Sequence, residues 1–287
     1  MPDRSGATIV VPGSSANLGP GFDVLAMALD RHVRVALGGD EHELSDKHPA
    51  RVAFQAAGGR GVFSFESTIP SGRGLGFSGA SIVAGTIIGL ISREGVEPID
   101  VNSFIEESRD EILERAATIE GHADNVAASL HGGVVGVADR TVVNIPVGFD
   151  ARLVVWVPTS STSTSKSRGA LADTVSRQDA VFNMSRVVML TQGLRIGDRR
   201  LLAIGGQDRL HQDRRFDAEP RSRMMCDALA RNGAIVSWLS GSGPSVAALT
   251  TGEEAEGLVR RMRSIMDEQG GQMLNVAIDV AGARQAT

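Results

Sequence analysis

The feature that most constrains this sequence is a glycine-rich stretch that runs directly into an apolar one. The stretch reads Pro70-Ser-Gly-Arg-Gly-Leu-Gly-Phe-Ser-Gly-Ala-Ser81, and the apolar run continues to Ile91. The run from Ser81 to Ile91 is too short to cross a bilayer, which needs about 20 apolar residues. We therefore predict a buried helix from about Ser78 to Ser92, entered from a tight loop.

A loop of this composition ahead of a helix is suited to binding an anion. The first N–H groups of a helix have no partner within the helix, and the helix dipole favours negative charge there. Glycines let a polyphosphate approach the backbone, and a serine hydroxyl in the first turn can reach a phosphate oxygen or Mg²⁺. The stretch matches neither the P-loop nor the dinucleotide-binding pattern. Taken alone, it also fits a ligand-free turn in which Ser78 only caps the helix.

The rest of the first half predicts strands alternating with helices. A β-branched run ends at Val11, and the segment from Pro12 to Asp23 is so rich in turn-forming residues that we predict an irregular loop. We predict a short helix over Val24 to Leu29 and a single helix from about Val101 to Ile119. A hairpin follows near Val134 to Ile145.

The composition changes around Pro146 to Asp150, just before an apolar strand that starts at Leu153. We place a domain boundary there, with one domain over residues 1–148 and a second over 149–287. Strands and helices alternate in both parts, which predicts an α+β protein made of two-layer α/β domains.

Composition excludes several classes of partner. The chain of 287 residues has a net charge of −5 and no cluster of basic residues, so a nucleic-acid groove is not expected. The single cysteine, Cys226, cannot form an internal disulfide. The first residues lack the pattern of a secretory signal, and no segment has the length of a membrane span, so we expect a cytoplasmic protein.

Five motifs in order make the sequence resemble a known family. The segment from Pro12 to Asp23, the loop at 70–81 and Leu239-Ser-Gly-Ser-Gly-Pro-Ser245 resemble the three motifs of the GHMP kinases. Gly121-His-Ala-Asp-Asn-Val126 and Asp208-Arg-Leu-His-Gln212 resemble the homoserine kinases among them. The resemblance spans residues 7 to 282. It implies the GHMP kinase fold, with an N-terminal ribosomal-protein-like α/β domain, a C-terminal ferredoxin-like domain and the active-site cleft between them.

The resemblance also implies ATP and Mg²⁺ as cofactors. It assigns Ser78 and Glu114 to the metal, because Glu114 lies eight residues before His122, the spacing that homoserine kinases show. Without the resemblance, Glu114 is one acid among several on a solvated helix face. The residues assigned to ATP are Pro70, Gly72, Arg73, Gly74, Leu75, Gly76, Phe77, Ser78, Gly79, Ala80, Ser81, Gly241 and Gly243.

For the phosphate acceptor the resemblance implies L-homoserine. Asp23 suits its ammonium group by charge, and Arg168 and Arg215 suit its carboxylate. Each residue also has a structural alternative: a helix cap for Asp23, a satisfied loop histidine for His122, and surface charges for the arginines. No catalytic base is identified, and Asp124 and Asp23 remain candidates. The assigned residues are Asn17, Asp23, His122, Asn125, Arg168 and Arg215.

The phosphate loop departs from the family's pattern at two positions, because Phe77 and Gly79 stand where Ser and Ala are usual. Phosphate binding by backbone N–H groups should survive these changes, whereas ATP affinity could shift. Two alternatives follow: a GHMP kinase acting on another small hydroxy compound, and an ATP-binding protein with impaired turnover. Many relatives are dimers, so a homodimer is possible by analogy.

Overall fold

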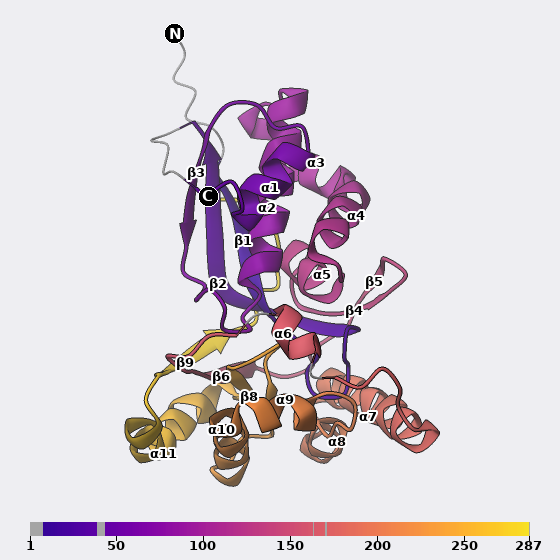
Figure 1. Cartoon of the computed structure of the whole chain (residues 1–287), viewed down its shortest axis with the longest axis vertical. Helices are drawn as coiled ribbons and strands as arrows, with labels where there is room; N and C mark the ends of the chain where they lie inside the picture. Colours follow the sequence, from indigo (N-terminus) through magenta and orange to yellow (C-terminus); the bar gives the residue numbers. More distant parts are fainter. Residues whose placement is uncertain (1–7, 39–43, 163, 170, 287) are drawn as a thin grey trace.

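The computed structural model describes residues 8–38, 44–162, 164–169 and 171–286. Two layered halves lie one above the other, and the short helix α6 lies between them (Figure 1). The first half comprises β1 Thr8–Ala16, β2 Leu25–Leu37, α1 Pro49–Ala56, β3 Phe63–Ser67, α2 Phe77–Glu94, a 3₁₀ turn Pro98–Asp100, α3 Val101–Glu107, α4 Arg109–Glu120, α5 Asp124–His131, β4 Val134–Ala138 and β5 Thr141–Asn144. The second comprises β6 Ala151–Val157, α6 Thr164–Gly169, α7 Arg177–Ile196, α8 Arg199–Gly205, α9 Gln212–Ala218, α10 Pro220–Arg231, β7 Val236–Leu239, β8 Val246–Thr251, α11 Gly252–Gln269 and β9 Gln272–Ala277, and β10 Arg284–Gln285 ends the chain.

The sheet of the first half is antiparallel and has the strand order β10-β1-β2-β4-β5, with β3 also paired to β2. Its long pair β1–β2 overturns two predictions. Residues 13–16 continue β1 beyond an irregularity at Pro12/Gly13, and residues 25–29 are strand, not helix. Leu25 to Leu29 are all buried, so the run has no polar face from which its period could be read. Pairing with β1 decides its conformation.

Helix α2 is the centre of the first half. It is buried continuously from Gly79 to Ile91, as predicted from the apolar run. A Cβ at Gly85 would overlap the backbone carbonyl of Ala50, and one at Gly89 would lie 2.8 Å from the carbonyl oxygen of Phe54. Glycine at these two positions therefore lets α1 lie directly on α2. The single helix predicted over 101–119 is instead two helices, α3 and α4, which meet at Ser108.

The sheet of the second half has the order β7-β8-β6-β9 and is also antiparallel. Strand β6 is buried on both faces, because its side chains alternate between two cores. Leu153 and Val155 belong to the large core shared with the first half, whereas Val154 and Trp156 pack in a smaller core with residues of α10 and α11. None of the helices in the described ranges is long and apolar enough to span a membrane.

The chain crosses from the first sheet to the second between β5 and β6, near the boundary predicted at residue 148. Its last residues then return to the first sheet, where β10 pairs with β1. Asp279 holds this return in place. Its buried carboxylate accepts from His32 Nε2 at 2.6 Å, from Arg284 Nη1 at 3.0 Å, and from the backbone N–H groups of Ala281 and Gly282 at 3.0 Å each.

Replacing Asp279 by Ala is therefore expected to lower the free energy of unfolding by about 3 kcal/mol, because it strands several donors around a buried site. Urea denaturation measures the loss. Asp267→Ala is the control, since Asp267 is exposed on α11, and it should change the free energy by less than about 0.5 kcal/mol. Equal effects from the two substitutions would show that the carboxylate network does not stabilise the C-terminal return.

Candidate active site

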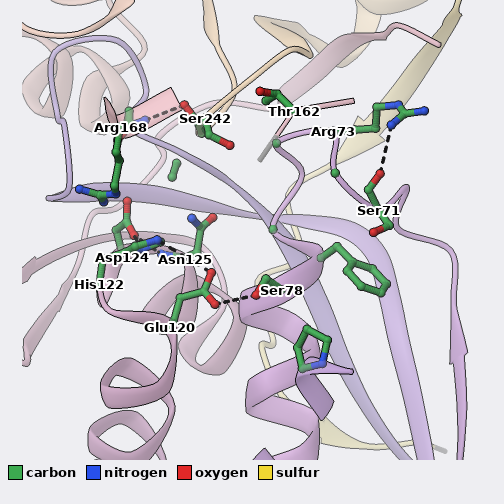
Figure 2. Close-up of a pocket in the computed structure, with 18 of the residues that line it drawn as sticks. Ser71, Arg73, Ser78, Glu120, His122, Asp124, Asn125, Thr162, Arg168 and Ser242 are labelled. Atoms are coloured by element: carbon green, nitrogen blue, oxygen red, sulfur yellow. Dashed lines mark hydrogen bonds and ion pairs between the residues drawn. The ribbon is translucent and has the colours of Figure 1, made fainter. Parts of the chain in front are cut away.

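A cavity of about 490 Å³ opens between the two halves. It contains residues from every motif identified in the sequence except Asp208-Arg-Leu-His-Gln212, which lies behind it. Figure 2 shows the phosphate-loop side, with Ser71, Arg73 and Ser78, facing the side that carries Glu120, His122 and Asn125. The lining residues are Ala16, Asn17, Asp23, His48, Pro49, Ser71, Gly72, Arg73, Gly74, Gly76, Phe77, Ser78, Glu120, His122, Asp124, Asn125, Thr162, Arg168, Arg215, Gly241 and Ser242.

The glycine loop delivers the start of α2 into this cavity. Gly76 is the N-cap, in the left-handed region at φ 72°, and no side chain caps the helix. The first intrahelical bond runs from the Ala80 N–H to the Gly76 carbonyl. The N–H groups of Phe77, Ser78 and Gly79 precede that bond, so they are the helix donors left for an anion. The alternative in which Ser78 caps the helix is excluded.

Not every loop residue assigned to ATP reaches the cavity. Pro70, Leu75, Gly79, Ala80, Ser81 and Gly243 do not line it, and Leu75, Ala80 and Ser81 are buried. The Gly79 N–H still lies in the first turn of α2, whereas the buried side chains of Leu75, Ala80 and Ser81 pack behind the loop. Gly74 lies against the glycine turn at 240–243 so closely that a Cβ on it would overlap the Ser240 carbonyl oxygen.

A chain of buried hydrogen bonds fixes this contact. The indole N–H of Trp238 donates to Ser15 Oγ at 3.0 Å, Ser15 Oγ lies 2.8 Å from Ser240 Oγ, and Ser240 Oγ donates to the Gly74 carbonyl at 2.7 Å. Ser240 Oγ gives its only proton to the Gly74 carbonyl, which can only accept, so Ser15 Oγ must donate to Ser240 Oγ and accept from the indole. It ties β1 and β7 to the carbonyl of Gly74 and so holds the phosphate loop in one position.

Arg73 lines the cavity and fixes the other side of the loop through backbone carbonyls. Its guanidinium donates to the carbonyls of Pro158 at 3.0 Å, Thr159 at 2.7 Å and Ser71 at 3.3 Å. The Thr162 N–H also donates to the Gly72 carbonyl at 3.1 Å. The segment 158–162 therefore lies along the loop, and Arg73 acts as a tie between the two halves.

The carboxylate opposite Ser78 is Glu120, which corrects the prediction of Glu114. Ser78 Oγ donates to Glu120 Oε2 at 2.7 Å at the wall of the cavity (Figure 2). Burial raises the pKa of Glu120, against the hydrogen bond from Ser78 and the charge of His122. Glu114 is exposed, pairs with Arg140 and lines a separate groove beside α1. Six residues of helix separate the two glutamates, which puts Glu114 about 120° away around α4.

The Gly121-His-Ala-Asp-Asn segment turns the end of α4 into the start of α5. Gly121, at φ 87°, ends α4 immediately after Glu120. His122 Nδ1 lies 2.7 Å from Asp124 Oδ1, and Asp124 also accepts the N–H of Asn125 at 2.7 Å. Burial lowers the pKa of His122, but the hydrogen bond and charge of Asp124 outweigh it, so the pKa lies above its ordinary value. Asn125 Oδ1 accepts from Ser14 Oγ at 2.7 Å, which leaves its Nδ2 to donate into the cavity.

Asn17 and Asp23 form the opposite wall. Both adopt positive φ, 73° and 58°, a conformation that Asn and Asp tolerate better than most residues. The Asn17 amide bridges two backbone groups, donating to the Gly241 carbonyl at 2.9 Å and accepting the Asp23 N–H at 3.1 Å. Asn17 therefore positions Asp23 against the glycine turn, and Asp23 does not cap a helix.

Two arginines complete the site, and neither is a free surface charge. Arg168 comes from α6 and binds Asp23 through two hydrogen bonds, at 2.8 and 2.6 Å. Arg215, on α9, is buried and donates to the Gly241 carbonyl at 3.0 Å. Both guanidinium groups lie over the ring of Phe22, at 5.5 and 5.1 Å from its centroid, and His211 stacks beside that ring.

Phe77 occupies the mouth of the loop beside His48, the N-cap of α1. Its ring packs edge-on against His48 and Phe65, with centroids 5.9 and 6.2 Å away. These neighbours come from the first half and accommodate the extra bulk without closing off the backbone donors of the loop. His48 and Thr162 line the cavity although they lie outside every motif of the sequence, and Ser242 lies between the two assigned glycines of the third motif. One signal in the sequence could have identified Glu120, because it directly precedes the motif Gly121-His-Ala-Asp-Asn125.

Family models place the chain among known proteins. The model "GHMP kinases N terminal domain" matches residues 47–133, and "GHMP kinases C terminal" matches residues 192–268. The chain belongs to the GHMP kinase family, whose members are ATP-dependent phosphotransferases. Within that family its relatives include homoserine kinases. The one from Caldanaerobacter subterraneus subsp. tengcongensis is 33% identical over 93% of this chain and 91% of that protein. The one from Desulfitobacterium hafniense is 34% identical over 95% of this chain and 97% of that protein.

Solved structures agree. A homoserine kinase from Cytophaga hutchinsonii superposes with a TM-score of 0.80 at 25% identity, covering 100% of this chain and 99% of that one. A putative homoserine kinase from Listeria monocytogenes superposes with a TM-score of 0.77 at 25% identity, covering 98% and 99%. The predicted α+β fold of the GHMP kinases is confirmed.

Proposed function

We propose that this protein transfers the γ-phosphate of ATP to the side-chain hydroxyl of L-homoserine and forms O-phospho-L-homoserine. The observation that carries the proposal is that groups for an ammonium and a carboxylate line the same cavity as the phosphate loop. Asp23, Arg168 and Arg215 supply those charges, and Ser78 and Glu120 lie across from them. The name of the relatives, homoserine kinase, supports the same substrate.

Mg²⁺ fits the donors available beside the loop. Ser78 Oγ and the Glu120 carboxylate, 2.7 Å apart, are hard oxygen ligands of the kind that hold Mg²⁺ together with phosphates and water. When bound there, the ion would neutralise charge on the phosphates. The free N–H groups of Phe77, Ser78 and Gly79 would bind phosphate oxygens, and Asn125 Nδ2 and His122 would orient the acceptor hydroxyl. Phosphoryl transfer depends mainly on such positioning and charge stabilisation.

The test is a coupled ADP-release assay with ATP, Mg²⁺ and L-homoserine. We expect homoserine to drive turnover and 4-hydroxybutyrate, mevalonate, shikimate and pantoate not to. Turnover with one of the other hydroxy compounds instead would keep the kinase class and reject homoserine. If no compound supports turnover while calorimetry detects binding of Mg²⁺–ATP, the alternative of an ATP-binding protein with impaired turnover is correct.

The cytoplasm as location is proposed from the sequence pattern described above, and a homodimer as assembly is proposed by analogy with relatives. Light scattering on a size-exclusion column tests the second. A monomer mass of 30.1 kDa at micromolar concentration would reject the dimer.

A further inference from the structure

Asp23 and Arg168 form an ion pair across the site where the substrate would lie. The guanidinium of Arg168 meets both carboxylate oxygens of Asp23, at 2.8 and 2.6 Å, and each side chain remains about one-third exposed, at 36% and 34%. Arg168 is delivered by α6, whose Ser167 hydroxyl donates to the Ser242 carbonyl at 3.0 Å. Both partners of the pair are thus held by backbone anchored to the same glycine turn, Asp23 through Asn17 and Arg168 through Ser167.

The second arginine differs from the first. Arg215 is only 5% exposed, and its described contacts are to the Gly241 carbonyl and to His211 Nδ1, at 3.0 and 3.2 Å. Its Nε is buried without a hydrogen-bond partner, and none of the ion pairs between described residues includes Arg215, although the charges of Asp23 and Asp208 act on it over a longer distance. Beside Glu120, His122 and Asp124, the cavity therefore contains, apart from Arg73, one directly paired arginine, Arg168, and one arginine without an ion-pair partner among the described residues, Arg215. A carboxylate can satisfy Arg215 directly, but it can use Arg168 only if that arginine releases Asp23.

We propose that the Asp23–Arg168 pair is a selectivity latch that only a zwitterionic amino-acid substrate opens without leaving a charge unpaired. The ammonium of the substrate takes the place of the Arg168 guanidinium on Asp23, and its carboxylate takes the place of Asp23 on Arg168, beside Arg215. Two ion pairs replace one pair and one solvated zwitterion, so every charge remains matched. This inference rests on the proposed function, because it assumes that the acceptor is homoserine.

A ligand with one charge cannot make this exchange. A hydroxy acid that pulls Arg168 away leaves Asp23 without a partner at a two-thirds buried site. An amino alcohol that pulls Asp23 away leaves Arg168 without a partner. Removing one member of a charge pair costs more than the pair contributes, because the remaining charge stays desolvated. A hydroxy acid must therefore either bind Arg215 alone and forgo Arg168, or open the pair and leave Asp23 unpaired, and in both cases the latch discriminates against it.

The variant Asp23→Asn tests the latch, because it frees Arg168 while Asn keeps the positive φ of this position. The measurement is calorimetry with Mg²⁺ and a non-hydrolysable ATP analogue, so no turnover is needed. The ligands are L-homoserine, 4-hydroxybutyrate, which lacks the ammonium, and 3-amino-1-propanol, which lacks the carboxylate. We expect the variant to bind homoserine at least about tenfold more weakly and 4-hydroxybutyrate about tenfold more tightly than the unchanged protein.

The gain for 4-hydroxybutyrate is measured against the loss of one negative charge, which by itself favours an anion. The same Asp23→Asn change made in an Arg168→Gln background measures that part alone. If the gain is equal in the two backgrounds, Asp23 never has to release Arg168 and the latch is rejected. Arg168→Gln supplies the mirror case, in which 3-amino-1-propanol gains affinity. Failure of the proposed function is distinguishable, because the unchanged protein would then not prefer homoserine to its two fragments, whatever the variants do.

Discussion

Replacing Glu120 by Gln is expected to lower kcat by about 10²- to 10³-fold, the loss typical of removing one electrostatic contact to a transition state. Gln keeps the shape of the side chain and can still accept the hydrogen bond from Ser78 Oγ, so the loss reports the missing negative charge. The coupled ADP-release assay at saturating ATP and homoserine measures it. Raising the Mg²⁺ concentration should restore part of the rate, because a weakened metal site fills again at higher concentration.

Glu114→Gln is the matched control on the same helix. Its side chain is 64% exposed and pairs with Arg140 outside the cavity, so kcat should stay within about twofold of the unchanged protein. Glu120→Gln should not lower thermal stability. Burial raises the pKa of Glu120, which means that the folded state disfavours its charge at neutral pH, and a neutral side chain removes that penalty. A large loss for Glu114→Gln with none for Glu120→Gln would restore the metal site to Glu114.

The finding that Glu120, and not Glu114, lies beside Ser78 shows what the sequence could and could not predict. Local chemistry sufficed for the phosphate loop, because the glycines and the apolar run from Ser81 to Ile91 lie together in the chain. Which carboxylate faces Ser78, the proposed metal site, depends instead on where α4 ends. The residue spacing carried over from relatives selected Glu114, whereas the helix continues to Glu120 and stops at Gly121. A shift of less than two turns rotates a different carboxylate into the cavity.

The other differences arise from contacts between distant segments. Leu25 to Leu29 form a strand because they pair with residues 13–16 and 134–136, and no local pattern reveals those partners. The resemblance assigned Arg73 to ATP, and only the folded structure shows that its guanidinium also donates to carbonyls 85 and 86 residues further on. Asp23 and Arg168 are 145 residues apart. The resemblance named both residues of the latch, but their pairing requires the folded structure.

The second large effect is expected from Gly74→Ala, which we predict to weaken Mg²⁺–ATP binding and kcat/KM by about 100-fold or more. Gly74 has φ 70°, and a Cβ there would overlap the Ser240 carbonyl oxygen and lie 2.8 Å from the Gly243 carbonyl oxygen. Backbone cannot give way as a flexible side chain can. Either the phosphate loop or the glycine turn must move, and the hydrogen bond from Ser240 Oγ to the Gly74 carbonyl, at 2.7 Å, is lost with the movement.

Gly95→Ala separates the collision from backbone strain. Gly95 caps the other end of α2 at φ 69°, almost the same conformation as Gly74, but no atom lies within 4 Å of a Cβ built on it. Both variants therefore carry the left-handed strain of about 1 to 2 kcal/mol, and only Gly74→Ala adds the overlap. Urea denaturation should show that the strain lowers the free energy of unfolding of both variants. Calorimetry should show lost Mg²⁺–ATP affinity only for Gly74→Ala. Equal affinities of the two variants for Mg²⁺–ATP would mean that the phosphate loop binds the nucleotide without its contact with the glycine turn.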